Sequence, residues 1–232
     1  MVPHAEPQVL AWQGRTITGL LLMVIGFLLD WLPYISDLGG LLILIGAVLV
    51  FLGRHGFGEA QVTSAARGMA LIVISFVATI GLAVWFVAAL VGQFVQSTAG
   101  QYSAGPGVDA VLQAFLYGIV AVGVLGALGY AVLGWGLADR PTRNLLLVAF
   151  VAQVAVSVLL VVLLLPVITS VINQTIANPS SNPASGFQNQ LYVYELVDGI
   201  PAGLFAWAYL RVRRSAIALS EGYRAQGGTL PG

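Results

Sequence analysis

The sequence predicts an all-α integral membrane protein, a bundle of six transmembrane helices with both termini in the cytoplasm. Of its 232 residues, 59% are hydrophobic and only 8% are charged, whereas soluble domains carry about 25% charged residues. The apolar residues are grouped in long stretches, as expected for helices that need about 20 apolar residues to cross a bilayer. The arginines are distributed unevenly between these stretches, and this distribution predicts the orientation.

The apolar stretches divide the chain into seven polar pieces, and bases occur only in the odd-numbered ones. All nine basic residues are arginines: Arg15, Arg54, Arg67, Arg140, Arg143, Arg211, Arg213, Arg214 and Arg224. Because cytoplasmic loops are enriched in Arg and Lys, the odd pieces are predicted to be cytoplasmic. The even pieces and their flanks carry only acids: Asp30, Asp37, Asp109, Glu195 and Asp198. Four acids lie inside against nine arginines, so the predicted charge is about +5 inside and −5 outside.

The first two predicted spans, 16–32 and 38–52, are short and are joined by a tight outer turn at 33–37. Such a hairpin either crosses the membrane with local thinning of the bilayer or re-enters on the side from which it came. Arg15 and Arg54 lie on the same side in both cases, so the charges do not separate the two alternatives.

The other four spans are predicted at 68–95, 108–137, 144–172 and 191–210. The inner turn at 139–143 is short, which makes the fourth and fifth spans antiparallel neighbours. The predicted organisation is a cytoplasmic tail at 1–14, a transmembrane domain at 15–214 and a second cytoplasmic tail at 215–232. Asn173 begins a pattern for N-glycosylation on the predicted outer loop after the fifth span.

Small residues follow one face of the fourth span and one face of the sixth. They are Gly123, Ala127 and Ala131, and Gly199 with Gly203. Small residues let helices approach closely in lipid, where no hydrophobic force drives helices together. These faces therefore serve either packing within one bundle or an interface between subunits.

Asp198 is an acid at membrane depth, seven residues inside the predicted outer end of the sixth span. Glu195 precedes it by three residues, so both carboxyl groups share a helix face. Ionisable residues at such depth are rare and often functional. The pair forms a cation or proton site, a catalytic site, or a wet outer funnel in which Asp198 bonds a neighbouring amide or tyrosine. Gln93 and Gln113 are candidate partners.

Several function classes are excluded by missing side chains. There is no cysteine, and the two histidines, His4 and His55, lie in predicted polar segments. An intramembrane haem, thiolate metal site or Ser–His dyad therefore has no ligands or base. The chain also has no lysine for a retinal Schiff base and no P-loop motif. We expect no metal and no cofactor, and the scattered arginines do not favour a nucleic-acid partner.

One resemblance extends over about the first hundred residues. The short hairpin rich in Leu and Gly, the loop GRHGFGEA at 53–60 and the long spans rich in small residues resemble uncharacterised archaeal polytopic membrane proteins. Because such proteins have no assigned activity, the resemblance implies a multi-pass membrane fold and no mechanism.

The leading functional prediction is a non-enzymatic, multi-pass protein of the cell membrane that forms an oligomer or serves as an accessory subunit of a larger membrane complex. It depends on the small-residue faces and on the missing catalytic groups. The alternative is a small cation or proton channel or transporter that uses the outer acids, with Asp198 and Glu195 as its site. An intramembrane enzyme is the third possibility.

Overall fold

The computed structural model is built entirely of helices in the residues that it describes, 7–32, 35–96, 106–177 and 184–226. Side chains at 92–108 and 172–196 lie outside that description. The elements are α1 (Pro7–Asp30), α2 (Ser36–Leu52), the short 3-10 helix η1 (Arg54–Phe57), α3 (Glu59–Gln96), α4 (Pro106–Trp135), α5 (Arg140–Ala177) and α6 (Ala184–Ala225). The prediction of an all-α protein is confirmed.

Four helices are long and apolar enough to cross a membrane, judged by length and composition: Pro7–Asp30, Glu59–Val91, Asp109–Trp135 and Arg140–Val171. This makes the chain a candidate multi-pass membrane protein. Helix α2 has 17 residues, about 26 Å at 1.5 Å per residue, and is shorter than the hydrocarbon core of about 30 Å. The sixth predicted span lies partly outside the described side chains, so six crossings and the orientation stay predictions.

The helices at both ends of the chain extend further than the predicted spans. Helix α1 begins at Pro7, a residue type suited to a first helical turn, and α6 continues to Ala225. Helical structure therefore enters both segments that the sequence assigned to tails. The physical reason is a buried contact between them, because Ser220 Oγ donates to Gln13 Oε1 at 2.9 Å and Gln13 Nε2 donates to the carbonyl of Gly56 at 3.0 Å.

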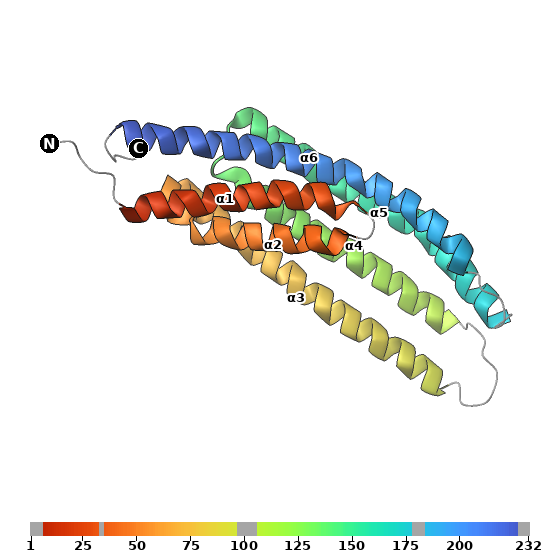
Figure 1. Ribbon diagram of the computed structural model, residues 1–232. Coiled ribbons are helices and arrows are strands. Elements are labelled where there is room, and N and C mark those ends of the chain that lie inside the picture. The colour runs from red at the N-terminus through yellow and green to blue at the C-terminus, as the bar shows by residue number, and fades with distance from the viewer. Residues whose placement is uncertain (1–6, 33–34, 97–105, 178–183, 227–232) are drawn as a thin grey trace.

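Helices α1 and α2 form an antiparallel hairpin (Figure 1), and glycines of the two helices face each other. A Cβ atom added to Gly19 would lie 2.6 Å from the carbonyl oxygen of Gly46, and one added to Gly46 would lie equally close to that of Gly19. Gly26 and Gly39 form a second such pair at 2.8 Å. The paired glycines are seven residues apart along each helix, so they lie on the same helix face.

Helices α3 and α4 form a longer antiparallel hairpin with similar contacts. A Cβ atom on Gly68 would lie 2.8 Å from the carbonyl oxygen of Gly129. Further along the contact, Ser75 Oγ donates to the carbonyl of Val122 at 2.9 Å. Van der Waals contact between closely packed helices and hydrogen bonds between them hold helices together in lipid.

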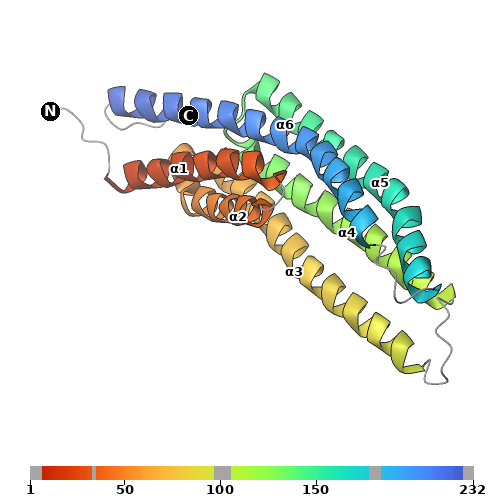
Figure 2. The same ribbon diagram turned by 45° about the vertical axis from the view of Figure 1, so that its right-hand side comes forward.

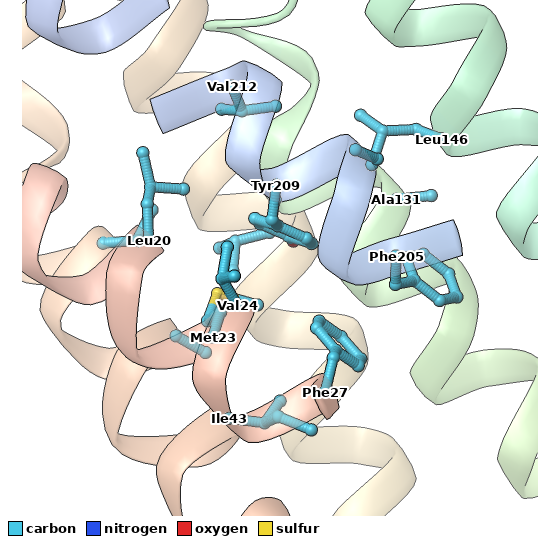
Figure 3. Close-up of a cluster of buried hydrophobic side chains, with 14 of the residues drawn as sticks. Leu20, Met23, Val24, Phe27, Ile43, Ala131, Leu146, Phe205, Tyr209 and Val212 are labelled. Carbon is cyan, nitrogen blue, oxygen red and sulfur yellow. The ribbon is translucent and has the colours of Figure 1, made fainter. Parts of the chain in front are cut away.

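The main core takes side chains from α1 to α6, including Ala65 and Ile72 of α3, and Figure 3 shows part of it. Phe27 of α1 stacks on Phe205 of α6 with ring centroids 5.2 Å apart. Tyr209, fully buried on α6, donates its hydroxyl to the carbonyl of Tyr130 at 2.6 Å. The first contact holds the α1–α2 hairpin against α6, and the second joins α6 to α4.

The four longer helices continue beyond the α1–α2 hairpin (Figures 1 and 2). A second, smaller core of Leu112, Leu116 and Val161 joins α4 to α5 there, and Phe86 of α3 packs against it. Helix α3 packs mainly on α4 and lies apart from α6 in both views. We call the opposite end, where α3 and α5 begin and α2 and α4 end, the arginine end.

Candidate functional site

Asp198 accepts a hydrogen bond from another helix. Gln153 Nε2 of α5 donates to Asp198 Oδ1 of α6 at 3.2 Å, and it also lies 3.5 Å from Ser157 Oγ. Both Asp198 and Gln153 are half-buried. The partner of the Asp198 carboxylate is therefore the Gln153 amide of α5. Of the two candidate partners that the sequence suggested, Gln113 is exposed on α4, and the side chain of Gln93 lies outside the described residues.

A second carboxylate, Asp30, belongs to the same cluster. It is the last residue of α1 and lies near enough to Asp198 for the two carboxylates to repel each other when both are ionised. A Cβ atom on Gly199 would lie 3.2 Å from the ring of Trp31, which places the end of α1 directly against α6. The sequence identified Asp30 as an outer acid, but its pairing with Asp198 depends on how α1 packs on α6. Glu195 is helical in α6, and its side chain lies outside the described residues.

The two carboxylates have no basic partner. Every arginine belongs to the described part of the chain, and within it none forms an ion pair with Asp30 or Asp198. The carbonyl of Val197 is a further acceptor on α6. Pro201, four residues later, has no backbone N–H that could donate a helical hydrogen bond to it. The cluster is rich in oxygen acceptors and carries uncompensated negative charge, which a proton or a cation would neutralise.

The polar cluster is separated from the arginine end by packed apolar side chains. Phe205 is 1% exposed, and Tyr209 and Leu146 are fully buried. Figure 3 shows these residues together with Phe27 and Ala131 in one cluster. A continuous polar path from Asp198 past Gln153 toward the arginines would have to pass through this core. In the described residues, no three His, Asp or Glu side chains gather closely enough to hold a metal ion.

The five small residues predicted as a packing or oligomer face fall into two groups. Ala127 and Ala131 are 3% and 2% exposed inside the main core, and Gly199 contacts Trp31. A Cβ atom on Gly123 or Gly203 would meet nothing within 4 Å. The first group is used for packing within the chain, and the second is open for contact with other molecules.

Comparisons with protein-family models, with curated proteins and with solved structures found no match for this chain. The resemblance to archaeal polytopic membrane proteins therefore stays a prediction.

Proposed function

We propose that this protein is a non-enzymatic, multi-pass protein of the cell membrane that assembles with itself or with other membrane subunits, with six spans and both termini in the cytoplasm. The observation that carries the proposal is the open side of α3. Only 6% of the apolar stretch of this helix is buried inside the chain. The surface turned away from α4 is apolar and exposed, as Val77 at 61% and Val84 at 65% illustrate.

Lipid alone can cover an apolar helix, so apolarity does not by itself require a partner. The spacing of small residues on this surface supports a partner helix. A single face of α3 carries exposed residues at spacings of seven, four, three and four positions: Ala70, Val77, Gly81, Val84 and Ala88. Such spacings match a face that packs on another helix, and its three small residues permit close approach. A Cβ atom on Gly81 would meet nothing within 4 Å, so no other described helix of the chain packs closely against this glycine.

The test is to block this face without disturbing the fold. We expect Gly81→Leu to convert the assembly into single chains, because the added side chain keeps a neighbouring helix at a distance. Ala83→Leu is the matched control, since Ala83 lies at the same depth on a different exposed face of α3. The measurement is the mass of the complex extracted in mild detergent, by light scattering and native mass spectrometry. A wild-type protein that is a single chain under these conditions, with no other subunit at fixed stoichiometry, contradicts the proposal.

A second candidate function is a small cation or proton channel or transporter. The cluster of Asp30, Asp198 and Gln153 favours it, because two carboxylates lie together without a base. The packed core around Phe205 opposes it. The test is flux of protons, Na⁺ and K⁺ into proteoliposomes, with Asp198→Asn as the variant. Flux equal to that of protein-free liposomes rejects this candidate, whereas the mass of the assembly should be the same for Asp198→Asn as for the wild type.

A further inference from the structure

A groove of about 710 Å³ opens at the arginine end, lined by residues of α3, α4 and α5. Its volume lies within the range of roughly 300–1,000 Å³ that is typical of ligand sites. One part of its wall is apolar, formed by Leu71, Leu128, Val132 and Leu147. The polar side chains on its wall include Glu59, Arg67 and the indole of Trp135. The groove therefore combines an apolar wall with charged groups.

A second arginine lies beside the groove. The guanidinium carbon of Arg143 is 5.6 Å from the centroid of the Trp135 ring, and its Nε donates to the Trp135 carbonyl at 3.2 Å. The terminal nitrogens of Arg143 are not used in that bond. Across the described residues, neither Arg67 nor Arg143 forms an ion pair with an acid. Two arginines against Glu59 leave the region with a net charge of about +1, counted from these three residues.

We propose that this groove binds an anionic phospholipid. Arg67 and Arg143 contact its phosphate, Trp135 lies at the level of the glycerol, and one acyl chain follows Leu71, Leu128, Val132 and Leu147. Arginine is well suited to phosphate because its guanidinium donates parallel hydrogen bonds. Tryptophan is enriched where lipid meets water, and basic pockets between helices on the cytoplasmic side bind anionic head groups.

The combination of features selects a lipid over other ligands. A free anion would leave the apolar wall uncovered, and an apolar helix would bury two unpaired arginines without compensation. An amphiphile with a negative head group satisfies both parts of the groove. The proposal requires insertion into a membrane but does not depend on assembly, so either idea can fail without the other.

The test uses the full chain in dodecyl maltoside, titrated with phosphatidylglycerol or phosphatidylcholine and followed by native mass spectrometry. We expect phosphatidylglycerol to bind more tightly. Arg67→Gln and Arg143→Gln should each weaken it about fivefold, since one arginine near an anionic lipid contributes about 1 kcal/mol. Arg224→Gln removes the same charge from the exposed end of α6 and should leave the Kd unchanged.

The apolar wall is tested separately with Leu128→Trp, which fills the groove and should weaken binding of both lipids. The melting temperature of each variant without lipid shows whether it folds. Equal Kd values for the two lipids overturn the proposal. It is also overturned if Arg224→Gln and Arg67→Gln raise the Kd for phosphatidylglycerol by the same factor. Competition by inorganic phosphate as strong as that by phosphatidylglycerol overturns the role of the acyl chain.

Discussion

The two N-terminal hairpins use the same packing device but differ in what covers them. In α1–α2 and in α3–α4, paired glycines bring antiparallel backbones into contact. Helix α1 of the first hairpin is also covered by α6, and 44% of its apolar stretch is buried, against 6% for α3. In lipid, unlike in water, leaving an apolar helix surface uncovered does not cost hydrophobic free energy. The contrast shows that close packing builds each hairpin, whereas contacts with a further helix, such as the stack of Phe27 on Phe205 and the bond from Ser220 to Gln13, decide how much of the hairpin is buried.

The largest effect is expected from Gly46→Leu in the covered hairpin. Its Cβ atom would lie 2.6 Å from the carbonyl oxygen of Gly19, and backbone atoms cannot move aside as a side chain can. We expect loss of the folded protein, seen as aggregation in size-exclusion chromatography, because the clash exceeds ordinary overpacking, which costs about 1–3 kcal/mol. Gly81→Leu, on the open hairpin, should leave the stability of the single chain unchanged. Equal stability of the two variants contradicts the contrast between the hairpins.

The next largest effect is expected from Phe205→Ala. Phe205 is 1% exposed and stacks on Phe27 of the covered hairpin, so its removal leaves a cavity. A buried Phe→Ala change costs about 3–5 kcal/mol, and the free energy of unfolding in mixed detergent micelles measures it. Phe76→Ala is the matched control because Phe76, on α3, is 55% exposed. We expect a change below about 1 kcal/mol for the control, as for other surface positions.

A smaller effect is expected from Gln13→Ala. This side chain is 1% exposed and joins α1 to η1 and to α6 through two hydrogen bonds. Its removal leaves the carbonyl of Gly56 and the hydroxyl of Ser220 without these partners, at a cost of about 1–3 kcal/mol for an unsatisfied buried group. The unfolding free energy of Gln113→Ala, at an exposed site on α4, should match that of the wild type. If both glutamine variants lose the same stability, the buried bonds are not what attaches α6 to the first hairpin.

The sequence predicts the helical class well because composition and apolar length report on it directly. It also predicts the short second helix and a polar role for Asp198. The partner of that acid was missed, because the Gln153 contact depends on the rotation of α5 against α6. The seven-residue spacing of Gly19 with Gly26, and of Gly39 with Gly46, is a signal in the sequence that would have predicted how the first hairpin packs.

The smallest effect is expected at the turn that connects the open hairpin to α5. Asp139 precedes α5, and its carboxylate accepts a hydrogen bond from the backbone N–H of Thr142 at 3.0 Å. Hydrogen bonds from the Thr142 side chain and backbone lower the pKa of Asp139 below its usual 3.8. A lowered pKa stabilises the folded state above the pKa of the unfolded chain, and this contribution disappears as pH falls through the folded value. We therefore expect the melting temperature of the wild type to exceed that of Asp139→Asn slightly at pH 7. The difference should shrink toward pH 3, and a difference that stays constant with pH would show that the carboxylate charge does not act at this turn.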